Sequence, residues 1–473
     1  MRTKFAILLA IAAVCVTTAW AGWAAEELIT SNGGFLGFPN GHRVVVATDG
    51  VRHLVWYGGY KRYYPGTGWT PDLTNKIGGD PSIALDGDGK TIHVVWQSEA
   101  GKGNKKTSHI FYQKCVPSSS GNGGWIGTPM DITPNGHRCW APSVACYQGH
   151  VVVAWFGFST DTLGFCEYVG GNWGTPRYFH DPSGTGGQVW NASIAVDPQD
   201  RYGDAFIAVS VTPPDGSGPV YVIRRHGGVW QAPENTRGNA NVDLAMPCIE
   251  VNPSTGYPHF VGHGYGHNIY HSYWNAVGGW QPPELISDPS VPLSQNANMF
   301  FSGSSAFVVW AETSSSSGRG IRYSVGSYGS WSTPAWVSSG YYDEYPSVTA
   351  RSNGDVYVVW TDGRGGIRGR LYTPGSGGGQ AEPIATSQSG VELFPNPAKA
   401  GRVMVQYSLP RTEPVRVTLL DISGRVVRSS AFGVRSSGEG SFSIDVSGLN
   451  AGVYVARLVA GDLSVSKSLV VER

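Results

Sequence analysis

Charged residues are scarce in this sequence, and the two signs cancel. Lysine and arginine number 34, aspartate and glutamate also number 34, and together they make up 14% of the chain. A protein that binds nucleic acid usually carries an excess of basic residues on one face. The balance therefore gives no reason to expect a nucleic-acid partner.

Cysteine is also rare, and its spacing argues against a zinc site. Six cysteines are present, and five remain once an N-terminal leader is removed, which is an odd number with no metal-ligand spacing. An oxidising compartment would permit a disulfide, but buried free thiols are the simpler interpretation. We expect no cofactor.

Long apolar runs are missing except at the N-terminus. Residues 1–21 combine a basic start, an apolar run from Phe5 to Val16 and the small-residue site Ala19-Trp-Ala21, which together are typical of a secretory signal peptide. The run is short for a membrane span, so we prefer a cleaved leader to an anchor. We expect no transmembrane anchor after processing.

Glycine and aromatic residues are abundant by contrast. The chain has 66 glycines, 17 tryptophans and 23 tyrosines, a composition typical of a turn-rich, all-β protein. In the stretch from Asp80 to Gln97, the apolar runs Ser82 to Leu85 and Ile92 to Trp96 flank an Asp-Gly-Asp-Gly turn, which predicts a tight β-hairpin. The hairpin pattern recurs in seven copies, including those at Pro142 and Pro346.

A second unit follows the hairpins: a short strand, then a tryptophan, most often as Gly-Trp or Ser-Trp, with a proline shortly after. The tryptophans are Trp69, Trp125, Trp173, Trp230, Trp280 and Trp331. A repeat of about fifty residues with four strands is the signature of a β-propeller. Because proline cannot donate to a sheet ladder, we assign the prolines of these units to the fourth, outermost strand. They are Pro71, Pro129, Pro176, Pro233, Pro282 and Pro334.

We predict a seven-bladed propeller over residues 22–373. The alternative is six blades with an irregular insertion, because the copies near Ser210 and Phe260 lack the terminal tryptophan. The last copy, Tyr345 to Tyr372, lacks the Trp and Pro unit, whereas Gly22 to Thr30 aligns without gaps on Gly279 to Ser287. We therefore expect the N-terminal segment to supply the outer strand of the last blade and close the ring.

The rest of the chain predicts a linker and a second domain. Residues 374–390 are rich in glycine and serine and predict a flexible linker. Residues 391–473 contain five strand-length alternating segments, which predict a small immunoglobulin-like β-sandwich.

Five motifs in this tail resemble the type A sorting domain of the type IX secretion system. They begin with Phe394-Pro-Asn-Pro and include Leu420-Asp-Ile-Ser-Gly-Arg, Leu449-Asn-Ala-Gly-Val-Tyr and a late lysine. The resemblance implies the type IX machinery as a partner, a secreted or cell-surface location, and usually removal of the tail. An ordinary immunoglobulin-like module is the alternative. The motif residues are Pro395, Asn396, Pro397, Gly424, Arg425, Gly452, Tyr454 and Lys467.

Candidate ligand-binding residues lie in the loops that precede the first strands and in the loops between second and third strands. Because strand direction alternates, both sets of loops open on one face of the ring; we call it the leading face. Arginine forks bind carboxylates and tryptophan rings stack on sugars, so a glycan is a reasonable ligand and a surface protein an alternative. The candidates are Arg43, Arg138, Trp140, Trp190, Arg319 and Arg364.

Two of these arginines close a repeated pentapeptide, Pro-Asn-Gly-His-Arg, at Pro39 and at Pro134. Asn-Gly is typical of a turn, and His-Arg is readily interpreted as a solvated pair, so a purely structural role is the preferred interpretation of both copies.

Histidines spaced by four suggest a metal site. In a regular hairpin centred on His267, His263 and His271 would face each other, and the three could hold zinc or copper, with His259 too far along the strand. No carboxylate partner is visible nearby, so we prefer solvated histidines and expect no metal.

The aromatic blade pattern over residues 22–372 resembles the sialidase-like secreted propellers with bacterial neuraminidase repeats. The resemblance implies Tyr345 as nucleophile, Glu344 as its partner and Asp80 as acid/base. The chain lacks an Arg-Ile-Pro motif and the Asp box of those enzymes. We therefore prefer non-catalytic binding of a glycan or protein; a sialidase-like exo-glycosidase is the alternative, and a structural surface-layer role is a third reading.

Overall fold

The fold is seen in a computed structural model of the chain. It describes residues 22–31, 33–73, 77–100, 107–117, 124–134, 138–157, 162–181, 187–197, 199, 201, 204–212, 218–237, 242–264, 267–314, 318–327, 329–338, 342–373, 391–394, 398–399, 401–409, 413–421, 425–435, 438–460 and 463–472. The expected signal peptide and linker, and the motif residues Pro395, Asn396, Pro397 and Gly424, lie outside these residues.

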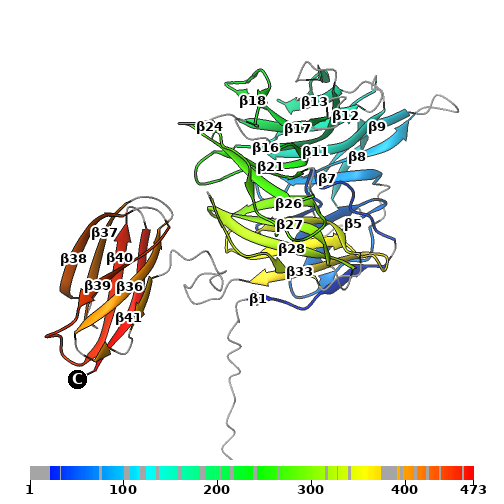
Figure 1. Cartoon of the computed structure of the whole chain (residues 1–473). Coiled ribbons are helices and arrows are strands. Elements are labelled where there is room, and N and C mark those ends of the chain that lie inside the picture. Colours follow the sequence, from blue (N-terminus) through cyan, green and yellow to red (C-terminus); the bar gives the residue numbers. More distant parts are fainter. Residues whose placement is uncertain are drawn as a thin grey trace, which may run out of the picture.

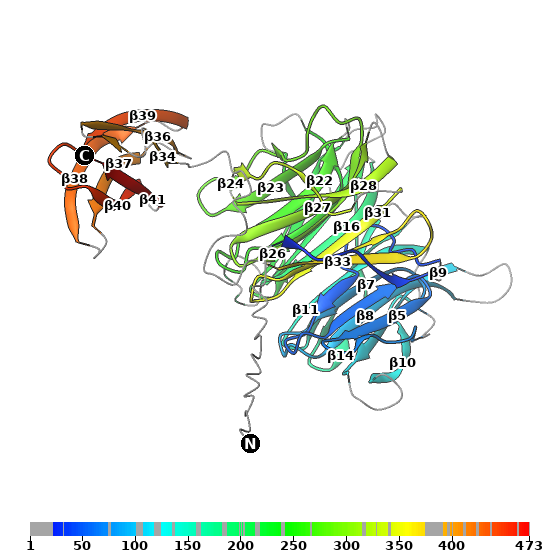
Figure 2. The same ribbon diagram turned by 90° about the horizontal axis from the view of Figure 1, so that it is seen from below.

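All the regular elements of the described residues are strands, as the composition predicts. No helix that could cross a bilayer occurs among them. Within the described part of residues 22–373, the strands form seven antiparallel sheets, coloured blue through yellow in Figures 1 and 2.

The first sheet consists of β3 (Val44–Val46), β4 (Arg52–Trp56), β5 (Gly59–Tyr64) and β6 (Gly68–Trp69). The second consists of β7 (Gly79–Leu85), β8 (Ile92–Ala100), β9 (Thr107–Cys115) and β10 (Trp125–Asp131). The third consists of β11 (Cys139–Tyr147), β12 (His150–Gly157), β13 (Thr162–Val169), β14 (Asn172–Trp173) and β15 (Arg177–His180). The next two consist of β16 (Gln188–Val196), β17 (Ala205–Thr212), β18 (Val220–His226), β19 (Val229–Trp230) and β20 (Glu234–Asn235); and β21 (Leu244–Val251), β22 (Pro258–Gly264), β23 (Ile269–Asn275), β24 (Gly279–Trp280) and β25 (Glu284–Leu285). The last two consist of β26 (Ser294–Ser302), β27 (Ser305–Ser314), β28 (Gly318–Ser327), β29 (Ser330–Trp331) and β30 (Ala335–Trp336); and β31 (Glu344–Ala350), β32 (Val356–Thr361), β33 (Ile367–Thr373), β1 (Gly22–Trp23) and β2 (Glu27–Thr30).

The seven sheets contact one another in cyclic order through their first strands. β3 contacts β7, and the contacts continue through β11, β16, β21 and β26 to β31, which returns to β3. The second strands, such as β12 and β32, are buried along nearly their whole length because neighbouring sheets cover both faces. The arrangement is propeller-like, with the first strands around a common axis.

The outer strand of four sheets is split at the predicted proline. In the third sheet, β14 and β15 pair with different parts of β13, and Pro176 lies between them. The pairs β19 and β20, β24 and β25, and β29 and β30 repeat the pattern. The missing N–H of proline accounts for the break in the ladder at the sheet edge.

The N-terminal segment completes the seventh sheet, which confirms the pairing predicted for it. Gly22 pairs with Thr373 and Trp23 with Tyr372, so β1 lies beside β33 (Figure 1). The Trp23 ring packs edge-on against Tyr323 and Tyr372, with centroids 5.2 and 5.3 Å away. Glu27 of β2 accepts hydrogen bonds from Tyr357 and, at 3.1 Å, from Trp69 of the first sheet.

The tail, orange to red in Figure 2, has two sheets and a core of its own. One sheet is β34 (Val391–Phe394), β36 (Arg402–Leu409) and β39 (Gly438–Asp445). The other is β35 (Ala398–Lys399), β41 (Leu463–Glu472), β40 (Gly452–Ala460), β37 (Glu413–Leu420) and β38 (Val426–Arg435). Inward-facing residues such as Val403, Val417 and Leu458 form the core between them.

The five cysteines of the described residues are buried and form no disulfide, as predicted. Burial raises the pKa of Cys248 to about 12. Such a thiol stays protonated and is a poor nucleophile or metal ligand at neutral pH.

We predict that Trp23→Ala destabilises the ring. The truncation removes a partly buried indole from the contact between the sixth and seventh sheets, which should cost about 2–3 kcal/mol of unfolding free energy. Urea unfolding followed by tryptophan fluorescence measures the effect. Leu28→Ala, at an exposed position of the same segment, is the control and should change stability by less than about 0.5 kcal/mol. Equal stability of both variants would contradict the closing role of Trp23.

Candidate functional site

Six of the seven first strands begin with the same β-bulge. In each, one residue at positive φ is followed by proline or alanine and then by a small polar residue, and the strand register shifts there. The positive-φ residues are Asp80, Ala141, Asn191, Met246, Asn296 and Tyr345. A bulge turns the strand and changes the direction of the next side chain.

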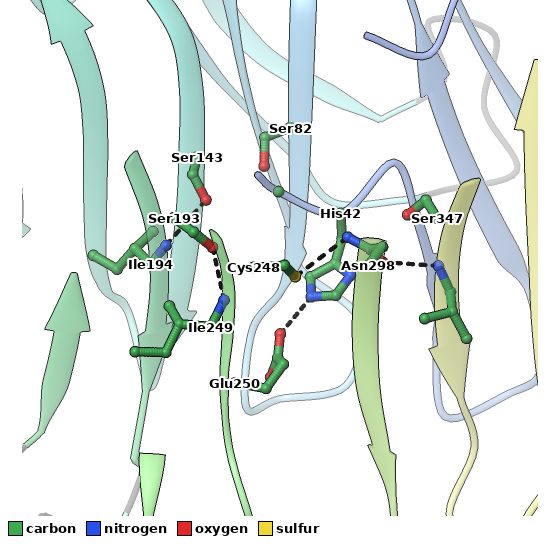
Figure 3. Close-up of polar contacts among 12 residues, drawn as sticks. His42, Ser82, Ser143, Ser193, Ile194, Cys248, Ile249, Glu250, Asn298 and Ser347 are labelled. Carbon is green, nitrogen blue, oxygen red and sulfur yellow. Dashed lines mark hydrogen bonds and ion pairs between the residues drawn. The ribbon is translucent and has the colours of Figure 1, made fainter. Parts of the chain in front are cut away.

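The small polar side chains after the bulges form a hydrogen-bonded circle, which we call the axial ring: Ser82, Ser143, Ser193, Cys248, Asn298 and Ser347. Each accepts a backbone N–H from the first strand of the following sheet. Ser143 Oγ accepts from Ile194 at 3.2 Å, Ser193 Oγ from Ile249 at 3.0 Å and Asn298 Oδ1 from Val348 at 3.0 Å (Figure 3).

The other members follow the same rule. Ser82 Oγ accepts from Val144 at 3.3 Å, Cys248 accepts from the backbone of Met299, and Ser347 Oγ accepts from Arg43 at 2.9 Å. At the one position without a small polar side chain, the His42 carbonyl accepts from Ile83 at 3.0 Å. The circle of inter-sheet bonds is therefore complete.

Residues 38–43, which we call the axial plug, lie inside this ring. Asn40 is fully buried, and its Nδ2 donates to the carbonyls of Ala141 at 2.7 Å and Ala192 at 2.8 Å. A Cβ at Gly41 would lie 2.5 Å from Ser82 Oγ, so only glycine fits there. His42 Nε2 pairs with Glu250 Oε1 (Figure 3).

Arg43 belongs to the plug and is enclosed by it. Its side chain is buried, and the guanidinium donates to the carbonyls of Leu36, Phe38 and Gly41. Burial lowers the pKa of Arg43 to about 10. The expectation of a solvated His-Arg pair is wrong for this copy of the pentapeptide, because the Arg43 side chain is buried and bonded to backbone carbonyls.

Four of the residues singled out from the sequence lie close together on the leading face. Tyr345 stacks edge-on against Phe35 with centroids 4.8 Å apart, and Asp80 accepts a backbone hydrogen bond from Phe38. Glu344 is ion-paired with Arg319. Burial raises the pKa of both Asp80 and Tyr345.

Asp343, which the sequence places in the same entry loop as Glu344 and Tyr345, has a perturbed carboxyl in this region. Burial raises the pKa of Asp343 to about 6, although Ser338 Oγ donates to it at 2.6 Å. The only sequence signal was its place beside Glu344 before a first strand. A carboxyl that titrates near neutral pH is suited to acid/base work.

The other arginines lie apart from this cluster or are engaged by neighbouring residues. Arg364 is exposed, and its Nε donates to Asp362 Oδ1 at 2.9 Å. Arg138 is exposed with φ of 43°, and its backbone N–H donates to Thr107 Oγ1 at 3.0 Å. The three residues before Arg138 lie outside the described part of the chain.

Trp140 and Trp190 belong to one aromatic group on the leading face. Trp140 pairs across the third sheet with Phe156, and the Phe156 ring stacks on Trp190 of the fourth sheet with centroids 5.2 Å apart. Phe156 is buried, whereas Trp190 is 36% exposed. Phe156 thus supports a partly exposed indole, an arrangement suited to stacking on an apolar sugar face.

The histidine hairpin is paired differently from the prediction. His263 pairs with Ile269, and His271 pairs with Val261, because the hairpin is centred one residue earlier than expected. The partner of His271 is His259, which the prediction excluded; their ring nitrogens lie 2.8 Å apart. Among the described residues, no group of three or more His, Cys, Asp or Glu side chains is placed to hold a metal.

The His259 and His271 pair repeats a packing motif of other sheets. His53 contacts the hydroxyl of Tyr60 at 2.6 Å, and His93 contacts that of Tyr112 at 2.8 Å. On the third strand, the residue paired with the histidine is Arg62, Lys114 or Tyr273, and the contact partner precedes that residue by two positions in all three sheets. His271 therefore occupies the tyrosine position of the repeat.

In the tail, four of the predicted motif residues lie in the described part of the chain. The Tyr454 hydroxyl donates to the Asn450 carbonyl at 2.8 Å, and Arg425 Nε donates to Asp421 Oδ2 at 3.0 Å. Lys467 is exposed on β41, and Gly452 begins β40.

A family model described as a secretion system C-terminal sorting domain matches residues 392–472. The tail is a sorting domain. This confirms the resemblance seen in its motifs and implies export to the cell surface or medium, with the secretion machinery as a partner. No curated protein matches the chain.

Solved structures resemble the chain in fold. An ulvan lyase of polysaccharide lyase family PL25 aligns with a TM-score of 0.52 and 10% identity, covering 74% of this chain and 96% of the lyase. The BP39L lectin from Burkholderia pseudomallei aligns with a TM-score of 0.52 and 12% identity, covering 72% and 97%. At these identities the likeness shows the propeller-like fold alone. A subtype N11 neuraminidase-like protein of A/flat-faced bat/Peru/033/2010 (H18N11), at a TM-score of 0.41, 11% identity and 76% and 98% coverage, is too distant to support an inference.

We predict that Asn298→Ala destabilises the ring of sheets strongly. The substitution leaves the Val348 N–H and the Pro39 carbonyl without their buried partner, which should cost about 3 kcal/mol. Urea unfolding measures the loss. Asn172→Ala removes an exposed turn amide and should change stability by less than about 0.5 kcal/mol. A loss no greater for Asn298→Ala than for this control would contradict the role of the axial ring.

We predict a loss of stability in acid to which His53 contributes. Burial lowers the pKa of His53 to about 3, so the unfolded chain takes up a proton first, and the contribution of His53 falls as the pH drops below about 6.5. At pH 4.5 the stability lost through His53, relative to pH 7, should amount to about 2–3 kcal/mol. His53→Phe should reduce the difference in urea midpoint between pH 7 and pH 4.5. His180→Phe, at an exposed site, should retain it, and equal pH profiles for His53→Phe and the unmodified protein would refute the assignment.

Proposed function

We propose that this protein is a secreted or cell-surface, closed seven-bladed propeller that binds a glycan non-catalytically through its leading face. The blade count is supported by the seven sheets and by their cyclic contacts. On this proposal, residues 1–21 are removed as a signal peptide, and residues 374–390 link the propeller to the sorting domain.

The observation that carries the proposal is the supported indole of Trp190. Its ring is held by Phe156 and still exposes 36% of its surface, while the axis beside it is filled by the plug. A rigid aromatic ring loses little conformational freedom on binding, so it is an efficient sugar-stacking group. Trp140 and the exposed Arg138 of the same face would add apolar contact and charge.

The fold neighbours are compatible with sugar binding but do not establish it. A lectin and a polysaccharide lyase both align with a TM-score of 0.52, and fold alone does not set function. The proposal therefore depends on the side chains of the leading face.

The alternative, a sialidase-like exo-glycosidase, is favoured by the carboxyls around Tyr345. Asp80 and Asp343 both have raised pKa values, which suits a general acid. Three observations disfavour it. Glu344 is ion-paired with Arg319, burial raises the pKa of the Tyr345 hydroxyl, and the Arg43 guanidinium is enclosed by carbonyls.

We predict that Trp190→Ala abolishes recognition of whichever glycan the intact protein binds on an array, with affinity lowered at least about tenfold, or about 1.4 kcal/mol. Trp336→Ala is the matched control, because Trp336 is 39% exposed but lies in the outer strand β30. It should bind as the unmodified protein does. Full binding by Trp190→Ala, or release of a fluorophore from a sialoside that is lost in Tyr345→Phe, would overturn the proposal.

A further inference from the structure

A cavity of about 180 Å³ lies between the first and seventh sheets, away from the leading face. It is bounded by the turns that join β3 to β4, β5 to β6 and β31 to β32, and such turns open on the opposite face of the ring. Its lining includes Arg52, Arg351, Asp355, Tyr63 and Tyr357. No role at this place follows from the proposed function.

Arg52 is held rigidly in the wall of the cavity. Its guanidinium carbon lies 4.1 Å from the centroid of Tyr63 and 4.1 Å from that of Tyr357, so an aromatic ring covers each face. Nη1 donates to Glu27 Oε1 at 3.1 Å, and the side chain is 12% exposed. A side-chain hydrogen bond also joins Arg52 to Tyr357, so two neighbours fix the guanidinium in the wall of the cavity.

Arg351 brings a second guanidinium to the same cavity. Its Nη1 lies 3.6 Å from Asp355 Oδ2, which is an ion pair but too long for a hydrogen bond. The guanidinium lies over Gly50, where a Cβ would stand 3.3 Å from Nη2. The side chain is 37% exposed, so Arg351 stands where solvent reaches the cavity.

We propose that this cavity binds a small oxyanion, the carboxylate or sulfate group of a compact ligand. Guanidinium groups match the paired oxygens of such a group, and the two tyrosines prevent Arg52 from turning away. The volume is below the range of a drug-sized pocket, which limits the ligand to an anion with part of its carrier. Asp355 is the intramolecular competitor for Arg351, and Glu27 is the ion-pair partner of Arg52.

The site also joins the two ends of the ring. Arg52 and Tyr63 belong to the first sheet, Arg351 and Tyr357 to the seventh, and Glu27 to the N-terminal segment that completes it. An anion bound to both arginines would cross-link the sheets at the closure. Binding should therefore raise the thermal stability of the folded chain.

The test is a thermal-shift and calorimetric titration of the full chain with sodium sulfate at constant ionic strength. We expect a saturable rise in Tm, affinity reduced at least tenfold in Arg351→Gln, and affinity increased in Asp355→Asn, which removes the competitor. Arg425→Gln, which disrupts another surface Arg-Asp pair in the tail, is the matched control and should bind normally. The absence of a saturable response, or unchanged affinity in Arg351→Gln, would overturn the proposal.

Two further arms separate the chemistry of the ligand from the glycan site. Sodium glucuronate should compete with sulfate and glucose should not; competition by glucose would contradict an oxyanion site. Trp190→Ala should bind sulfate normally, so failure of the glycan proposal leaves this one standing, and loss of sulfate binding in that variant would contradict a separate site.

Discussion

The fold depends on a circle of inter-sheet hydrogen bonds around its axis. A small polar side chain after each of six bulges accepts the backbone N–H of the next sheet, and the carbonyl of His42 supplies the seventh acceptor. These bonds are buried, so a missing acceptor leaves an unpaired N–H away from water. The circle fixes the spacing of the first strands, and apolar packing between sheets then fills the space outside it.

The axial plug accounts for where chemistry can and cannot take place. Asn40, Gly41 and Arg43 fill the ring. The side chains of Asn40 and Arg43 donate to backbone carbonyls, so Arg43 is not available to a ligand at the axis. Exposed groups are left on the leading face, around Trp190, and between the first and last sheets, around Arg351. The sorting domain places both surfaces outside the cell.

Much of the architecture could be predicted from the sequence, because repeats record local patterns. The Pro-Ser-Val and Trp-Pro units predicted the inner and outer strands of the sheets. The likeness of Gly22-Trp23 to Gly279-Trp280 predicted that the N-terminal segment pairs with the last sheet, as an outer strand does. The site was harder. The two copies of the pentapeptide are identical in sequence, yet Arg43 is buried and Arg138 is exposed. Only the first copy lies at the ring position where a backbone carbonyl, that of His42, replaces the small polar side chain. The histidine pairing failed because a hairpin centre displaced by one residue changes every partner.

The central claim is that the axial ring is one cooperative unit that holds the sheets together. Native-state hydrogen exchange of the backbone amides of Ile194, Ile249, Val348 and Arg43 tests it most directly. The account predicts that all four exchange only through global unfolding, with opening free energies within about 1 kcal/mol of the value from urea unfolding. Exchange of Arg43 or Val348 through local opening, several kcal/mol below the global value, while neighbouring strand amides stay protected, would contradict it.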